Sequence, residues 1–132
     1  MRGRTTALQA LSETGHRLYG FSNGASHDLQ ILLEQAGLLN QLQGVISVEV
    51  VKSFKPDPKV YRHFISATRT ITQYTVLVSS NPFDIVGAGN QGWKTIWITR
   101  QNSNDADLWG YQPSLILPDL STLPQALTTL QL

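Results

Sequence analysis

Three short polar segments contain most of the side chains in this sequence that could do chemistry. They are Ser22-Asn23-Gly24, Lys55-Pro56-Asp57-Pro58 and Ser79-Ser80-Asn81-Pro82-Phe83-Asp84. Hydroxyl and amide groups bind anions, an ammonium group pairs with a carboxylate, and an aspartate can act as a nucleophile or a general base. Each segment taken alone also fits a turn or a helix cap, so its chemical meaning depends on where the fold places it.

Strands and helices are expected to alternate around these segments. Short β-branched and aromatic runs predict strands over residues 17–21, 45–48, 74–78, 95–98 and 114–117. Helical spacing of apolar residues, with proline or glycine near the ends, predicts helices over residues 7–13, 26–36, 58–67, 83–91 and 123–130. This alternation is typical of an α/β fold in which helices cover both faces of a parallel sheet.

The three polar segments follow the first three expected strands. Because the carboxyl ends of parallel strands meet at one edge of a sheet, the segments should gather there, next to the N-termini of the following helices. Helix N-termini favour anions. The residues therefore predict a site for a small carboxylate or phosphate, without fixing the reaction.

Composition excludes several other classes of protein. The chain has 132 residues, 41% of them hydrophobic, and a net charge of +1 from 10 basic and 9 acidic residues. This predicts one domain with a core and argues against a nucleic-acid binder, which would carry a basic surface. No apolar run approaches the roughly 18 residues of a membrane span. The absence of cysteine excludes disulfides and thiolate metal sites and fits a cytoplasmic location.

The polar segments and their surroundings resemble the haloacid dehalogenase (HAD) superfamily, and specifically the L-2-haloacid dehalogenases (type II). The resemblance covers about residues 5–130, in order and with matching spacing. It implies a HAD-like Rossmannoid parallel sheet. The matching stretches are residues 18–24 (LYGFSNG), 55–61 (KPDPKVY), 78–88 (VSSNPFDIVGA) and 92–100 (GWKTIWITR).

The resemblance implies a reaction on small 2-haloalkanoic acids. In this family an aspartate on the first strand attacks the carbon that carries the halogen, and an ester forms. Water then hydrolyses the ester at its carboxyl carbon and releases a 2-hydroxy acid. The small carboxylate is the expected partner, no cofactor is expected, and the family often forms homodimers.

The resemblance also gives expected roles to three substrate-binding residues. Ser22 would donate a hydrogen bond to the substrate carboxylate. Asn23 would help to hold the leaving halide or to orient the nucleophile. Tyr61 would match a tyrosine of the pocket.

Four further residues match catalytic positions of the family. Lys55 would keep the nucleophilic aspartate ionised through charge pairing. Ser79 and Asn81 would position the catalytic carboxylates. Asp84 would orient or activate the hydrolytic water.

The last polar segment also bears on a phosphatase alternative. Phosphatases of the superfamily usually carry a second acid four or five residues before the final aspartate, and the two acids hold Mg²⁺. Ser79 and Ser80 occupy those positions here. Because Mg²⁺ prefers charged oxygen ligands, the sequence predicts no metal site and favours the dehalogenase subgroup.

Two parts of the family pattern are missing from the sequence. No apolar strand carries the nucleophilic aspartate, and no helical cap surrounds the halide position. In the family's strand order the missing strand lies centrally, between the strands that end at Phe21 and Val78. We therefore expect residues 1–132 to form a partial core domain that is inactive and marginally stable alone. The alternatives are a phosphatase fragment, a pseudoenzyme and one half of a split protein.

Overall fold

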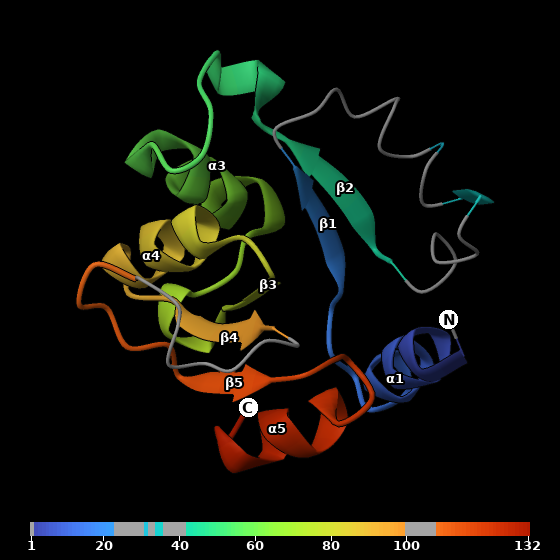
Figure 1. Ribbon diagram of the computed structural model, residues 1–132. Helices are drawn as coiled ribbons and strands as arrows, with labels where there is room; N and C mark the ends of the chain where they lie inside the picture. Colours follow the sequence, from blue (N-terminus) through green and yellow to red (C-terminus); the bar gives the residue numbers. More distant parts are fainter. Residues whose placement is uncertain (1, 23–30, 32–33, 36–41, 100–107) are drawn as a thin grey trace.

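The computed structural model of the chain is an α/β fold (Figure 1), described for residues 2–22, 31, 34–35, 42–99 and 108–132. Strands and helices alternate along most of this length. In chain order the elements are α1 (Arg2–Glu13), β1 (Tyr19–Ser22), β2 (Gly44–Ser47), the 3₁₀ turn η2 (Val48–Val51), α3 (Pro58–Thr68), η3 (Thr72–Tyr74), β3 (Val76–Ser79), α4 (Pro82–Asn90), β4 (Lys94–Ile98), β5 (Leu115–Leu117) and α5 (Leu123–Thr129).

The described strands form two separate parallel sheets. β1 pairs with β2, with Phe21 opposite Ile46, and β3, β4 and β5 form the second sheet in that order. β1 and β3 are not hydrogen-bonded to each other (Figure 1). The division falls between β1 and β3, where the resemblance places the missing central strand, so the expected fold class is confirmed.

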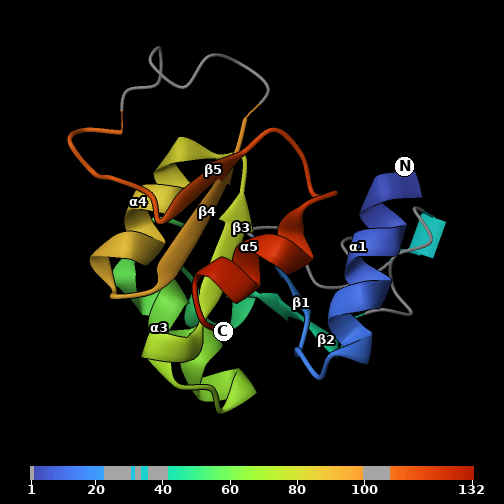
Figure 2. The same ribbon diagram turned by 90° about the horizontal axis from the view of Figure 1, so that it is seen from below.

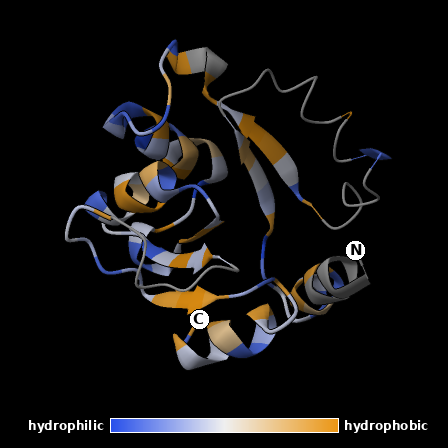
Figure 3. Ribbon diagram, viewed as in Figure 1, coloured by the Kyte–Doolittle hydropathy of each residue, from blue (hydrophilic) through white to orange (hydrophobic). Residues whose placement is uncertain are grey.

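Helices cover both faces of the three-stranded sheet. On one face, Leu77 and Trp97 pack in the same apolar cluster as residues of α3 and α4. On the other face, Ile96 packs with residues of α1 and α5, among them Leu11 and Leu127. Figure 2 shows α5 and α1 on the side away from α3 and α4, and Figure 3 shows the hydrophobic colouring of β2 and β5. The alternation of side chains along β3 and β4 thus builds two cores.

Most predicted elements lie within a few residues of their observed positions. The largest difference concerns α1, which begins at Arg2 and not near residue 7. Gly3 and the β-branched Thr5 and Thr6 have low helix propensity, which hid this first part of the helix. The predicted helix over residues 26–36 lies almost entirely outside the described residues.

The helices α3 and α4 begin in the same way. Asp57 caps α3, because its Oδ1 accepts a hydrogen bond from the Lys59 N–H at 2.9 Å, and Pro58 follows it. Asn81 caps α4 through Oδ1 and the Phe83 N–H, also at 2.9 Å, and Pro82 follows it.

Within the described residues, no helix is long and apolar enough to cross a membrane.

Candidate functional site

Lys55 and Asp84 form a buried ion pair next to the end of β1. Lys55 Nζ lies 2.8 Å from Asp84 Oδ2, and the two side chains are only 9% and 5% exposed. Nζ also donates to the main-chain carbonyl of Phe21 at 2.9 Å and lies 4.1 Å from the centre of the Phe21 ring. The loop between η2 and α3, which contains a cis Lys55–Pro56 peptide bond, thus brings the lysine to β1 and α4.

Tyr61 holds the other oxygen of the same carboxylate. Its hydroxyl donates to Asp84 Oδ1 at 2.8 Å, so Asp84 accepts from a phenol on one side and an ammonium on the other. Burial of the hydroxyl raises the pKa of Tyr61, and the charge of Asp84 and this hydrogen bond raise it further. Tyr61 therefore stays a neutral donor, and the Asp84 carboxylate is fixed in orientation.

Gly87 allows Tyr61 to come this close to α4. A Cβ atom at Gly87 would lie 2.5 Å from the Tyr61 hydroxyl oxygen and 2.8 Å from Pro56 Cβ. No side chain fits at such distances, so the glycine sets the spacing between α3 and α4. Asp84 lies one helical turn before it, on the same side of α4 as Gly87.

Ser79 and Asn81 make local contacts in the described structure. Ser79 Oγ accepts a hydrogen bond from the Asn81 N–H at 3.0 Å, and Asn81 Oδ1 is the cap of α4. Both side chains therefore fix the start of the helix that carries Asp84. Asn81 is exposed to solvent, next to the end of β3.

Of the two expected substrate-binding residues at the end of β1, the structure describes the first and not the second. Ser22 is the last residue of β1, half-buried and paired in register with Ser47 of β2. Asn23 lies outside the described residues. Ser22 and Ser79 are the last residues of parallel strands, one residue beyond the predicted strand ends at 21 and 78.

A cluster of aromatic rings packs beside the site. The Phe21 ring packs against Tyr61, Phe64 and Trp93, with centroid distances of 5.8, 5.0 and 6.0 Å. Tyr61 also meets Trp93 edge to face at 5.5 Å. Phe21 and Tyr61, which contact Lys55 and Asp84, belong to this cluster, and such apolar surroundings strengthen the attraction between the two charges.

The sequence reasoning missed the roles of Phe21 and Gly87. Both lie inside stretches that resemble the family, but neither carries a reactive group. A glycine inside a helix, three residues after an acid, is the one signal that could have pointed to close packing. Lys55 was also expected to pair with a first-strand aspartate, whereas in this chain its partner is Asp84.

The geometry defines what the arrangement can do. A fixed carboxylate can orient a water molecule or accept its proton, and a buried ammonium can stabilise a second anion that approaches it. Within the described residues, no group of three histidine, aspartate or glutamate side chains could hold a metal ion.

Comparisons with known proteins agree on one family. A family model described as haloacid dehalogenase-like hydrolase matches residues 1–98. (S)-2-haloacid dehalogenase 1 of Pseudomonas sp. (strain CBS-3) is 36% identical over 123 residues, which are 93% of this chain and 54% of that protein. Haloacetate dehalogenase H-2 of Moraxella sp. (strain B) is 30% identical over 117 residues, 89% of this chain and 52% of that protein.

Solved structures give the same result. The L-2-haloacid dehalogenase from Xanthobacter autotrophicus with chloropropionic acid covalently bound is 27% identical and superposes with a TM-score of 0.85, covering 94% of this chain and 59% of that one. The chain spans about half the length of the curated relatives that it matches. Since the family model matches most of its residues, the chain belongs to the haloacid dehalogenase-like hydrolase family.

Proposed function

We propose that this chain is part of the core domain of a dehalogenase that removes halide from small 2-haloalkanoic acids through an aspartyl ester. One observation carries the proposal: Lys55, Asp84 and Tyr61 form a buried, hydrogen-bonded set beside the end of β1, in a chain similar to haloacid dehalogenases. The proposed substrate class is taken from the similar proteins, one of which holds covalently bound chloropropionic acid.

The first step needs a carboxylate that this chain does not provide. An aspartate oxygen would attack C2 of the haloacid, the carbon–halogen bond would break, and the halide would leave with the electron pair. Lys55 would keep the attacking carboxylate ionised. Ser22 and Asn23 would bind the substrate carboxylate and the halide, and Tyr61 would form a wall of the pocket.

The second step uses Asp84. A water oxygen would add to the carboxyl carbon of the ester, and the 2-hydroxy acid would leave as the aspartate carboxylate is restored. Asp84 would orient this water and accept its proton, while Ser79 and Asn81 would hold the carboxylates in place. The bonds from Lys55 and Tyr61 keep Asp84 in the position that this role needs.

The described aspartates have other partners, which supports an inactive chain. Asp57 accepts hydrogen bonds from Ser53 and from the main chain of Lys59, Asp84 is paired with Lys55, and Asp119 accepts from Ser121. The nucleophile would arrive on a strand between β1 and β3, where the two sheets are separate. Completion by such a strand is therefore part of the proposal.

Chloride release from 2-chloropropionate tests the proposal directly. The 132-residue chain should release no chloride. The same chain, extended at its N-terminus by an apolar strand ending in aspartate and a helical cap, should release it without added metal. Release of phosphate from phosphate esters that requires Mg²⁺, with no chloride release, would favour the phosphatase alternative and contradict the proposal.

A pair of lysine variants sharpens the test. In the extended chain, Lys55→Met should lower chloride release by about a hundredfold or more, because the nucleophile loses its paired charge. Lys59→Met removes an equal charge from an exposed position of α3 and should leave the rate within about twofold. Equal rates for both variants would remove Lys55 from the mechanism.

Location and assembly also belong to this proposal. A cytoplasmic location is supported by the cysteine-free composition. A homodimer is supported by the exposed aromatic pair Phe83 and Trp109, whose rings lie 5.0 Å apart and which are 57% and 58% exposed. Sedimentation of the extended chain would report the dimer.

A further inference from the structure

Phe21 contacts the ammonium group of Lys55 in two ways at the end of β1. Lys55 Nζ lies over the face of the Phe21 ring, 4.1 Å from its centroid. Nζ also donates a hydrogen bond to the main-chain carbonyl of Phe21 at 2.9 Å. A cation within about 6 Å of a ring centroid is attracted by the negative face of the ring. Since any residue at this position would offer the carbonyl, the ring is the contribution of phenylalanine itself.

Burial makes the attraction between the ring and the ammonium group stronger. The Lys55 side chain is only 9% exposed, and Asp84 Oδ2 lies 2.8 Å from Nζ. An ammonium group with so little water around it depends on protein groups, and a cation–π contact is stronger for a desolvated cation than for an exposed one. Asp84 attracts Nζ toward α4, whereas the ring and the carbonyl of Phe21 attract it toward β1. The ammonium group is therefore held between the two elements.

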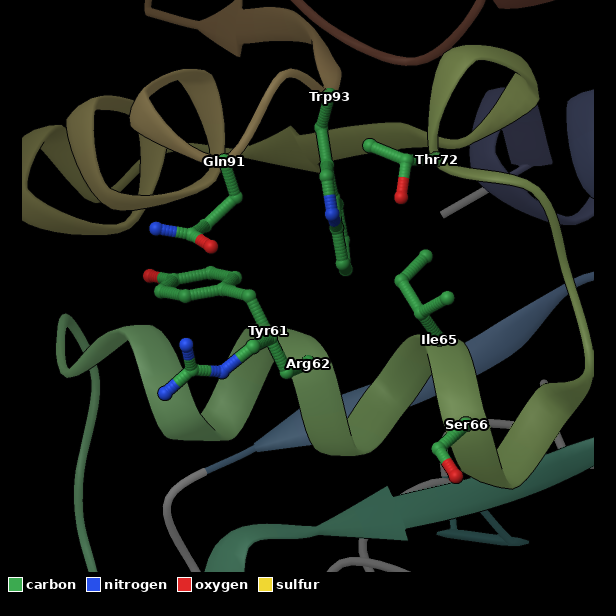
Figure 4. A pocket seen from close by; sticks show the side chains of 7 residues that line it. All are labelled: Tyr61, Arg62, Ile65, Ser66, Thr72, Gln91 and Trp93. Carbon is green, nitrogen blue, oxygen red and sulfur yellow. The ribbon is translucent and has the colours of Figure 1, made fainter.

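The Phe21 ring is itself fixed by three other rings. Trp93 stacks on it at an interplanar angle of 29°, Tyr61 meets it edge to face at 82°, and Phe64 packs with a centroid distance of 5.0 Å. Figure 4 shows Tyr61 on α3 and Trp93 just before β4, which project toward each other. These contacts join β1 to α3 and to the start of β4, although no hydrogen bond joins β1 to β3 in the described structure. The ring is thus a rigid support for the charge of Lys55.

We propose that Phe21 is a positioning residue of the dehalogenase reaction, whose ring holds the Lys55 ammonium group beside the place that the attacking carboxylate would take. This inference rests on the proposed function. The four-carbon stem of lysine is flexible, so Asp84 alone would let Nζ turn toward α4 and away from β1. With the ring in place, Nζ stays within reach of both carboxylates. A ring that only filled space would have no effect on the charge.

Fluorinated phenylalanines at position 21 of the extended chain test the proposal. Fluorine withdraws electrons from the ring face and changes the shape of the side chain little, so it weakens the attraction for a cation. Chloride release at saturating 2-chloropropionate should fall stepwise from mono- to di- to pentafluorophenylalanine, by about tenfold for the last. The KM should stay within about twofold, because binding of the substrate carboxylate is proposed for Ser22 and Asn23.

Phe64 provides the matched control. It packs in the same apolar cluster as Phe21, and the described structure places no cationic group over its ring. The same fluorinated series at position 64 should leave chloride release within about twofold of the unmodified rate. Equal losses at the two positions would show that fluorination acts through packing, and they would overturn the proposal.

A comparison of stabilities decides the question without chloride release. Pentafluorophenylalanine is placed at position 21 in the extended chain and in its double variant Lys55→Met/Asp84→Asn, which removes both charges of the pair together. The urea midpoint should drop about twice as far, or further, in the chain that keeps Lys55. Equal drops would overturn the role of Phe21, even in a chain that releases chloride. Unequal drops in a chain that releases no chloride would support the hold of the ring on Lys55 and contradict the dehalogenase proposal.

Discussion

At the scale of single residues, the site depends on the charge and hydrogen bonds that compensate the buried Asp84 carboxylate. A buried carboxylate is costly unless charges and hydrogen bonds compensate it, and Lys55 and Tyr61 do so on separate oxygens. The resemblance predicted all three residues. It could not predict that Lys55 would pair with Asp84, because that contact depends on how the loop before α3 approaches β1 and α4.

Replacing Gly87 with alanine should destabilise the chain by about 1–3 kcal/mol. The new Cβ would collide with the Tyr61 hydroxyl and with Pro56, so α3 and α4 must move apart. Gly44→Ala is the control, since its Cβ would meet only Tyr19 at an ordinary 3.6 Å. Urea unfolding of the extended chain measures the free energy of unfolding of both variants. Equal stability of the two variants would show that α3 and α4 do not pack as described.

The raised pKa of Tyr61 should make stability fall at high pH. The folded state keeps the Tyr61 proton, while the unfolded chain loses it above the ordinary value of 10.0. The stabilising contribution is therefore complete below pH 10 and is lost as the pH rises further. Urea unfolding between pH 8 and 11 should show a smaller decline for Tyr61→Phe than for Tyr74→Phe, which alters a 65% exposed tyrosine. Identical pH profiles would contradict the buried hydrogen bond to Asp84.

At the scale of elements, two capped helices place the reactive groups. Asp57 and Asn81 are each followed by proline, and both residues cap the helices that begin there. Strands and helices followed from residue patterns because those patterns are local. The tight approach of α3 to α4 was not predictable, since it depends on contacts between Gly87, Tyr61 and Pro56 across the fold.

The cap of α4 predicts a clear split between two variants of Asn81. Asn81→Ala removes the acceptor for the Phe83 N–H and should cost about 1 kcal/mol of stability. Asn81→Asp keeps the acceptor and adds a charge that the helix N-terminus favours, so its stability should not fall. Thermal unfolding of the extended chain compares them. If both variants lose stability equally, the Asn81 side chain acts through contacts other than the cap.

At the scale of the whole molecule, the described strands form two sheets, and no hydrogen bonds join β1 to β3. Main-chain groups at such edges need partners when they are buried. We expect the 132-residue chain to unfold without a sharp transition or to aggregate, and the extended chain to melt cooperatively. Calorimetry with light scattering compares the two. A sharp, reversible melt of the short chain as a monomer would show that the two sheets suffice.

Trapping of the aspartyl ester tests the central claim most directly. The chain and its extended form are mixed with 2-chloropropionate, quenched in acid within one turnover and weighed intact by mass spectrometry. The extended chain should gain the mass of the acid minus chloride, on its added aspartate, and the 132-residue chain should gain nothing. An ester on the 132-residue chain, or none on the extended chain, would contradict the claim that this half holds the supporting residues and lacks the nucleophile.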